Sequence, residues 1–522
     1  MITTDMLPVS VIEGTGFRAL MSFVKPEYCV PERQTITSQL EKCYEQSVKS
    51  LQEKLENAVQ VVLATDCWTA LSTECYMTVT CYYIEDWELQ SAVLHTESMA
   101  ERDTAENLAE KLNSTAERWG LAGRVLACVH DNASKMSLDV LERAVTWESV
   151  CCFADSLQQA INDGFSASGV DHIVAAANRL VSHFHRSTVA AEALERKQTQ
   201  LQLKQHRLIQ LCKTHWDSVY DMFERLCEQR SAVTGVLSDS CVTNQSDAQM
   251  LQLQEEHWQL IEEILPVLSS LKCATAAMSD ELSVSISNIY PVCNSLLQKH
   301  LQSETPVKNR KVAYFKTALH RFLEHHLQPN NPAITAKPAL IASLLDPRHK
   351  HLQFLLPVIQ ITAKSKLLQL ASMVEIEELP RNTAMEQMRT ELDEPEPVVK
   401  MTTESDEPEP AAKKRRETEA IMMLLGEDYT KQEYERNAVE NEVEKYFREP
   451  CPSLKCSPLE WWKVNAQRFP RLAKLAKGYL CIPASFVPTE CVCSNVSLTV
   501  NHLRARLAPE HVNMLIFLNK NQ

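Results

Sequence analysis

Apolar residues recur along this chain with different spacings, and each spacing predicts a different kind of element. Residues 37–59 place apolar side chains three to four positions apart, which is the period of a helix with one buried face. The uninterrupted apolar run at 61–65 predicts a buried β-strand. Residues 75–84 and 87–94 alternate β-branched and aromatic residues with polar ones on either side of an acidic pair, which predicts a β-hairpin.

The alternation of strands and helices continues to about residue 144. Residues 103–119 have a helical pattern with Asp103 as its N-cap, and 124–130 form another short apolar run. Residues 132–144 return to the helical period. Three antiparallel strands, a helix, a strand and a helix make up an α/β unit with a mixed sheet.

From about residue 154 to 375 the helical pattern is almost continuous. It is clearest at 200–212, 249–272, 286–301 and 313–327, where apolar positions recur every three to four residues. A helical run of this length after an α/β unit predicts a large all-helical insertion.

The composition then shifts sharply. Residues 391–410 contain eight acidic residues and one lysine, and such a segment cannot bury enough apolar area to fold. The basic patch Lys413-Lys414-Arg415-Arg416 that follows fits a nuclear localisation signal. The alternative is that the patch only balances the neighbouring acidic charge. The stretch from about 430 to the end is rich in aromatic residues and predicts an ordered segment.

Composition and charge exclude several classes of function. The 522 residues carry a formal net charge of −15, which argues against general, charge-driven binding of nucleic acid. Any DNA contact is therefore expected to come from a local basic patch or from a module that is absent from this sequence. No apolar run approaches the roughly 18 residues of a membrane span, and the first residues lack a secretion signal. The 18 cysteines are therefore expected to be reduced thiols.

Two cofactor patterns are present only in fragments. The close pairs Cys151-Cys152 and Cys491-x-Cys493 lack a second pair of ligands at zinc-finger spacing. Gly14-x-Gly16 with Ala19 fits a dinucleotide fingerprint, but a long helix follows where a second strand ending in an acidic residue is needed. We expect no cofactor of either kind.

Three acidic residues stand at positions where a metal-dependent reaction could take place. Asp66 follows the first strand run, Asp131 follows the later one, and Glu490 lies far downstream. Carboxylates at the ends of neighbouring strands can converge on two divalent ions that activate water for phosphoryl displacement. The alternative is that they are turn formers or helix caps, which also follow strands.

Five motifs in this order resemble the hAT transposase superfamily, and among its members the domesticated vertebrate proteins that carry a zinc-finger BED domain. They are Thr65-Asp66-Cys67-Trp68-Thr69, His130-Asp131-Asn132-Ala133-Ser134-Lys135-Met136, Cys152-Phe153-Ala154, Ser343-Leu344-Leu345-Asp346-Pro347-Arg348, and the run Arg506-Leu507-Ala508-Pro509-Glu510-His511-Val512-Asn513-Met514-Leu515-Ile516-Phe517-Leu518. The resemblance extends over nearly the whole chain except the acidic linker.

The resemblance implies an α/β fold: an RNase H-like core with a mixed sheet, interrupted by a large all-helical insertion and followed by a helical hAT dimerisation region. The expected segments are a helical N-terminal segment (1–60), the first part of the core (61–170), the helical insertion (171–375), the acidic linker with its basic patch (376–429) and the dimerisation region that completes the core (430–522). In this family pattern Asp66, Asp131 and Glu490 are the DDE carboxylates, and Trp216 stacks near a flipped base.

Several neighbours of these residues depart from the family pattern. Asp155 stands where the family has the histidine of Cys-x-x-His, His215 stands where it has an arginine, and Cys491 replaces the arginine after the third acid. These changes remove donors and positive charge from a DNA-facing site. The BED finger that precedes this region in the family is expected to be absent from the chain.

We therefore expect a domesticated hAT transposase-like nuclear protein without catalysis that acts as a dimeric DNA-associated or transcriptional regulatory factor. The alternatives are an active DDE transposase, which would use Mg²⁺, and a protein-interaction scaffold without DNA binding. The expected partners are a second copy of the chain and DNA or chromatin proteins, with no membrane and no small-molecule substrate. The aromatic residues of the C-terminal stretch must be buried on the core or on a partner, and aromatic residues are enriched at interface centres. The alternative is that they only cover the sheet of the core. The resemblance to the hAT dimerisation region favours a dimer interface with Trp461, Trp462, Leu515 and Phe517.

Overall fold

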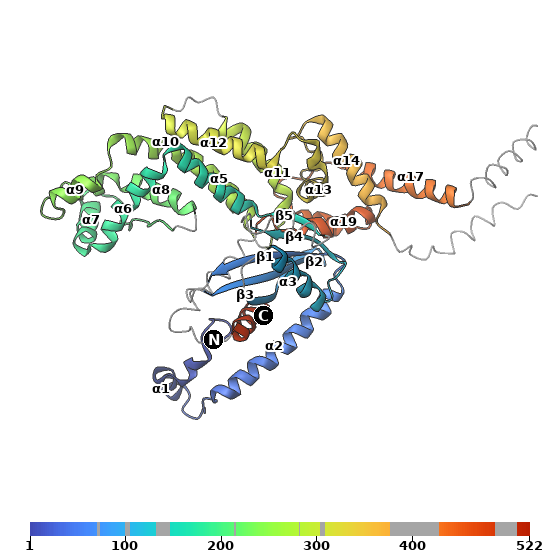
Figure 1. Ribbon diagram of the computed structural model, residues 1–522, viewed down its shortest axis with the longest axis horizontal. Helices are drawn as coiled ribbons and strands as arrows, with labels where there is room; N and C mark the ends of the chain where they lie inside the picture. Colours follow the sequence, from blue (N-terminus) through green and yellow to red (C-terminus); the bar gives the residue numbers. More distant parts are fainter. Residues whose placement is uncertain are drawn as a thin grey trace, which may run out of the picture.

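A five-stranded mixed sheet lies at the centre of the computed structural model, and a long arm of helices extends from one side of it (Figure 1). The structure describes residues 1–69, 74–99, 105–131, 147–212, 216–280, 282–302, 308–375, 427–485 and 509–521. The predicted helix at 132–144, the N-cap Asp103 and the acidic linker with its basic patch lie outside these residues. The division into five segments thus stays a prediction.

The strand order is β3-β2-β1-β4-β5. The strands are β1 (Val61–Thr69), β2 (Cys75–Glu85), β3 (Glu88–Met99), β4 (Val125–His130) and β5 (Glu148–Cys151). β1, β2 and β3 pair antiparallel, whereas β4 pairs parallel with both β1 and β5. This arrangement confirms the predicted mixed sheet. The sequence did not predict β5, because four residues are too short for a periodic signal.

Helices cover both faces of the sheet. On one face α2 (Arg33–Glu56) and α3 (Ala105–Arg118) pack over the odd-numbered residues of β1, such as Leu63. On the other face α5 (Phe153–Ser168) and α19 (Pro470–Leu480) pack over the even-numbered residues, such as Val62 and Ala64. Because side chains alternate along a strand, burial on both faces explains why this strand reads as an uninterrupted apolar run.

The outer strand β3 is covered by the C-terminal helix α21 (Pro509–Lys520) (Figure 1). The side-chain amide of Asn521 donates to the carbonyl oxygen of Val93 and accepts from its backbone N–H, at 2.8 and 3.0 Å. Asn513 accepts from the backbone N–H of Thr96 at 2.8 Å. The exposed groups of an edge strand are a template for unwanted pairing, and here side-chain amides satisfy them.

The helical arm begins at the end of the sheet. After α5 it contains α6 (Asp171–Arg186), α7 (Thr188–Gln200), α8 (Asp217–Leu237), α9 (Gln245–Leu251), α10 (Glu255–Met278), η2 (Ile286–Asn288), α11 (Ile289–Ser295), η3 (Leu296–Leu301), α12 (Arg310–Leu327), η4 (Pro332–Ala336), α13 (Pro338–Leu345) and α14 (Pro357–Ser372). The predicted helical insertion is therefore confirmed. The N-terminal helices before α2 are η1 (Val9–Glu13) and α1 (Thr15–Val24), and the C-terminal ones are α17 (Glu427–Arg448), α18 (Pro458–Asn465), α19 and α21.

One predicted helix of the arm is wrong. Residues 203–212 form no helix, and Gln202 turns the chain with a positive φ of 56°. We call residues 201–212 the strap. Its backbone carbonyls accept hydrogen bonds from side chains of the flanking helices, including Gln229 to Lys204 at 3.1 Å and His185 to Leu208 at 2.7 Å. Tertiary partners thus replace the hydrogen bonds that a helix would have supplied.

The end of α13 is bound to the C-terminal segment by two aromatic donors. The last carbonyls of a helix have no partner within the helix. The hydroxyl of Tyr446 donates to the carbonyl of Leu344 at 2.9 Å, and the indole N–H of Trp462 donates to that of Leu345 at 2.8 Å. Both aromatic side chains are fully buried, so water cannot replace these bonds.

A buried lysine completes the same contact in the opposite direction. Lys350 Nζ donates to the carbonyls of Tyr446 and Glu449, at 2.7 and 2.5 Å, near the end of α17. Its ammonium also lies 4.9 Å from the centre of the Tyr446 ring, a cation–π distance. Burial lowers the pKa of Lys350. We call the groups of these two paragraphs, Leu344, Leu345, Lys350, Tyr446, Glu449 and Trp462, the helix-end junction.

Trp462→Phe should destabilise the protein clearly more than Trp461→Phe. Both changes replace the indole by a smaller ring without an N–H, but only the first removes a described hydrogen bond. It leaves the buried carbonyl of Leu345 without its donor, which costs about 1–3 kcal/mol. Urea unfolding followed by circular dichroism measures the difference. Equal shifts of the two midpoints would contradict the role of the indole N–H.

Candidate functional site

Asp66 and Asp131 lie on neighbouring strands, but only Asp131 directly follows its strand: β1 continues beyond Asp66 to Thr69, so the prediction that Asp66 ends the first strand is wrong. β1 and β4 are parallel with Ala64 opposite Val129, and extending this register by two residues places Asp66 opposite Asp131. By the alternation of side chains, both carboxylates project to the face covered by α5 and α19. Asp66 is 8% exposed. The structure therefore brings Asp66 and Asp131 to one sheet edge, as the strand pattern predicts.

A rigid polar wall adjoins Asp66. Thr78 of β2 is its antiparallel partner, and the Thr78 hydroxyl lies 3.2 Å from that of Thr96 and accepts from the indole N–H of Trp68 at 3.1 Å. The Trp68 and Tyr76 rings stack with centroids 4.9 Å apart. These contacts hold the β1 side of the site in one conformation.

The backbone after β4 is fixed by a histidine. His130 Nδ1–H donates to the carbonyl of Asp131 at 2.7 Å, because a carbonyl can only accept. Its Nε2 therefore accepts from the Ser149 hydroxyl of β5 at 2.8 Å. The imidazole is buried and serves to orient the strand ends.

Charges of both signs converge where β5 passes into α5. Burial raises the pKa of the Cys151 thiol, and the carboxylates of Asp131 and Asp155 raise it further, while Lys337 lowers it. Asp155 stands in the first turn of α5, at the position where the resemblance expects a histidine. The substitution adds a second carboxylate, besides that of Asp131, that raises the pKa of the Cys151 thiol.

The third acid, Glu490, lies outside the described residues. The described chain before it runs along the start of α5: the backbone N–H of Phe153 donates to the carbonyl of Ala484 at 2.8 Å, and Cys152 Sγ lies 3.6 Å from Ser485 Oγ. The oxygen donors of Asp66 and Asp131 fit the ligands that Mg²⁺ prefers, and these two residues would hold such an ion. Among the residues that the structure describes, no three His, Cys, Asp or Glu side chains are grouped to hold a metal ion.

Trp216 does not lie open to a base. It is 5% exposed, packs in the core of the helical arm, and its backbone N–H donates to the Gln158 side chain at 3.1 Å. The expectation of a stacking surface at Trp216 is therefore not met in this conformation, because the ring is already covered by helical-arm residues. His215 lies outside the described residues.

The residues assigned to the dimer interface are buried within the single chain. Trp462 belongs to the helix-end junction, and Trp461 stacks on Phe469 with centroids 6.1 Å apart. Leu515 and Phe517 are buried between α21 and the sheet with its covering helices. Trp462, Leu515 and Phe517 are buried and Trp461 is partly buried by the single chain, so their packing needs no second copy.

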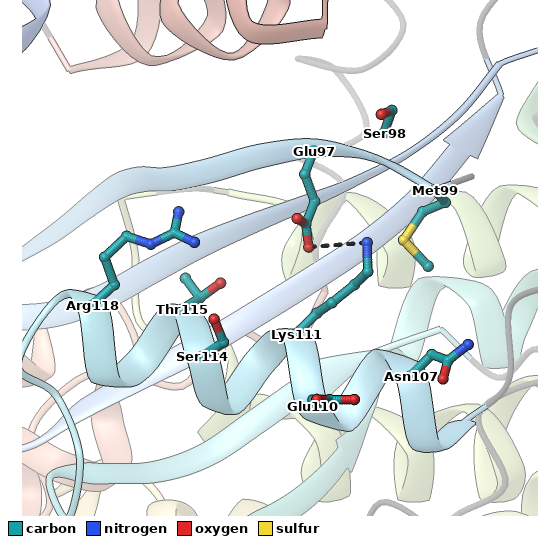
Figure 2. Close-up of a pocket in the computed structure, with 9 residues that line it drawn as sticks. All are labelled: Glu97, Ser98, Met99, Asn107, Glu110, Lys111, Ser114, Thr115 and Arg118. Carbon is teal, nitrogen blue, oxygen red and sulfur yellow. Dashed lines mark ion pairs between the residues drawn. The ribbon is translucent and has the colours of Figure 1, made fainter. Parts of the chain in front are cut away.

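A polar cavity of about 450 Å³ lies between β3 and α3, on the side of the sheet away from the two aspartates (Figure 2). Figure 2 shows Lys111 of α3 reaching toward Glu97 of β3, an ion pair of 3.3 Å, with Arg118 at the other end of the cavity. Because Glu97 pairs with Met77 and Asp66 with Thr78, the cavity and the aspartates use opposite faces. The cavity is separate from the acidic site.

Comparison with known protein families assigns three parts of the chain. Residues 64–151 match the ZBED1 RNase-like domain, 150–267 the ZBED1 RNase-like helical domain, and 442–522 the hAT family C-terminal dimerisation region. The order of these matches is the order of the sheet, the helical arm and the C-terminal segment. The chain is a hAT-derived, BED-like protein.

Individual relatives agree with this assignment. The human zinc finger BED domain-containing protein 4 is 24% identical over 541 residues, covering all of this chain and 43% of the relative. The human zinc finger BED domain-containing protein 6 is 24% identical over 67% of this chain and 37% of the relative. The transposable element Hobo transposase of Drosophila melanogaster is 48% identical over 46 residues, which are 9% of this chain and 7% of that protein.

This hAT-derived protein thus spans less than half the length of the BED relatives it matches. The match to an RNase-like domain confirms the expected core fold, and the match at 442–522 supports self-association. No helix in the described part of the chain has the length and apolar character needed to cross a bilayer.

Proposed function

We propose that this hAT-derived protein is a nuclear, dimeric, DNA-associated regulator that has lost transposase catalysis. The observation that carries the proposal is the charge at the strand ends. Asp66 and Asp131 share one sheet edge, and Asp155 adds a third carboxylate where the family pattern has a histidine. A phosphodiester brought to this edge meets repulsion in place of a cationic donor.

The supporting substitutions extend beyond the described residues. The sequence has His215 and Cys491 at positions where the resemblance expects arginines. Arginine binds phosphate through two parallel hydrogen bonds, and neither histidine nor cysteine supplies that geometry. Because all three carboxylates of the pattern are present, a divalent ion could still bind. We therefore expect the loss of the two arginines to impair the positioning of DNA.

The purified chain should not nick or join terminal-repeat DNA with Mg²⁺ or Mn²⁺. Product formation should equal that of the Asp66→Ala variant, measured on denaturing gels with end-labelled duplex. The similarity to a transposase keeps catalysis as the second candidate. Metal-dependent nicking by the wild-type chain that disappears in both Asp66→Ala and Asp131→Ala would establish it and refute our proposal.

We assign nuclear import to Lys413-Lys414-Arg415-Arg416. A fluorescent reporter fused to residues 391–425 should enter the nucleus, because a cluster of basic side chains is what import receptors bind. Lys413→Ala with Lys414→Ala should leave the reporter in the cytoplasm, while the matched Lys→Arg pair should keep it nuclear. The assignment fails if the alanine variant enters the nucleus as efficiently as the wild type.

The dimer should use side chains of the matched C-terminal region that the single chain leaves exposed. Val464 is 79% and Leu454 is 71% exposed, whereas Trp462 is fully buried. Light scattering at tens of micromolar should give a dimer mass for the wild-type chain. Val464→Asp with Leu454→Asp should lower the dimer fraction about tenfold, since burying two carboxylates is costly.

Val189→Asp, at an exposed position of α7 outside the matched region, is the control for the added charge. It should leave the dimer intact. Circular dichroism confirms that each variant is folded. A folded wild-type chain that remains monomeric, or a dimer equally stable in all variants, would show that this surface is not the interface.

A further inference from the structure

Helix α6 carries a polar groove on the side away from its buried face. The buried face consists of apolar residues packed into the helical arm, among them Leu180 and Phe184. The opposite side borders a cavity of about 500 Å³. The residues that line it, which we call the α6 groove, are Asn178, Arg179, Ser182, His183, Arg186 and Ser187.

The groove has positive charge that no acidic residue in the described part of the chain neutralises through an ion pair. Arg179 and Arg186 are exposed, and neither forms an ion pair with a residue in the described part of the chain. On the neighbouring helix α8, by contrast, Arg225 pairs with Glu228, and Arg230 pairs with glutamates of α10. No carboxylate is among the described residues that line the groove. In a chain with net charge −15, two uncompensated guanidinium groups beside one cavity form a local anion-attracting surface.

Two further polar atoms of the groove are buried without a hydrogen-bond partner. They are Asn178 Oδ1 and His183 Nε2. Buried polar atoms are nearly always hydrogen-bonded, so such a pair beside a cavity indicates a place for a polar ligand. A half-turn of the Asn178 amide directs its N–H₂ to the same place, and His183 Nε2 can carry a proton. Both atoms have almost no exposed surface, so a side-chain rotation toward the cavity is needed before either can donate to an anion there.

The groove lies along the strap that leads to Trp216. Gln210 of the strap donates to the hydroxyl of Ser182 at 3.4 Å, and His185 bonds the strap carbonyl of Leu208. One residue of the groove, Ser182, therefore contacts the strap, so the groove lies next to this segment.

We propose that the α6 groove binds the phosphate backbone of DNA. The inference rests on the proposed association of this protein with DNA and names the surface responsible. Arg179 and Arg186 each engage a phosphate with parallel N–H donors, and Asn178, Ser182 and His183 donate to the same or the adjacent phosphate. The groove contacts no base edge in this arrangement, so it contributes affinity and position without sequence preference.

The test compares two pairs of surface arginines. Arg179→Ala with Arg186→Ala removes two charges from the groove, and Arg310→Ala with Arg321→Ala removes two exposed, unpaired charges from α12 in the same arm. Binding of each full-length chain to a labelled DNA duplex of mixed sequence is measured by fluorescence anisotropy at salt concentrations from about 50 to 200 mM. Circular dichroism checks that all chains are folded.

The groove variant should bind about tenfold more weakly at the middle of this range. Its slope of log affinity against log salt should be smaller by about 2, since each neutralised phosphate contributes about 0.9. The α12 variant should match the wild type. Excess inorganic phosphate at constant ionic strength should compete only weakly, because a single phosphate replaces one contact of a duplex that presents many linked phosphates.

Three results would overturn the inference, and they differ in what else they affect. If the wild-type chain binds DNA and the groove variant binds equally well, the groove is wrong while DNA association stands. If both variants lose affinity equally, general charge is responsible, and the groove is again wrong. If the wild-type chain binds no DNA at any salt concentration, the proposed association fails, and the groove proposal fails with it.

Discussion

Unsatisfied carbonyl groups at the ends of two helices determine how this chain closes on itself. α13 ends with carbonyls that accept from Tyr446 and Trp462, and α17 ends with carbonyls that accept from Lys350. The donors for α13 thus come from the C-terminal segment, and the donor for α17 comes from the turn that follows α13. A buried carbonyl without a donor costs about 1–3 kcal/mol, so the helical arm and the C-terminal segment are each far less stable apart than together.

A buried acid next to this junction sets the geometry of the turn that follows α13. Asp346 is fully buried, accepts from Ser287 at 2.7 Å and forms a two-pronged ion pair with Arg348. The resemblance motif that ends in Asp-Pro-Arg is thereby a structural element, and its aspartate is no catalytic candidate. The C-terminal segment continues from α19 to the sheet, where Ala484 and Ser485 lie beside Phe153 and Cys152.

The distribution of charge separates two regions that a transposase would use together. Carboxylates lie within β1, directly after β4 and in the first turn of α5, whereas Arg179 and Arg186 of α6 form no ion pair within the described part of the chain. An electrostatic arrangement of this kind favours holding a polyanion along the arm over admitting a phosphodiester to the sheet edge. This arrangement is the basis of the proposal that the protein keeps the fold of its relatives and uses it for association.

The sequence by itself determined the elements whose stability is local or follows from one repeating pattern. The uninterrupted run of β1, the alternation of β2 and β3 and the helical period of α10 and α12 follow directly from burial on two faces, one face or a stripe. The placement of Asp66 and Asp131 on adjacent strands also followed from that pattern, although β1 continues past Asp66 to Thr69. The short strand β5 carried too few residues for a period to be visible.

Only the tertiary structure decided the parts that depend on distant partners. The strap has a helical sequence pattern, but side chains of α6, α7 and α8 donate to its carbonyls in a non-helical conformation. Trp462 has the composition of an interface residue, but a carbonyl of α13, 117 positions earlier in the chain, accepts its N–H within the same molecule. The hydrophobicity of an aromatic side chain predicts that it will be buried. It does not identify the surface that buries it, because that surface is formed only when distant parts of the chain fold together.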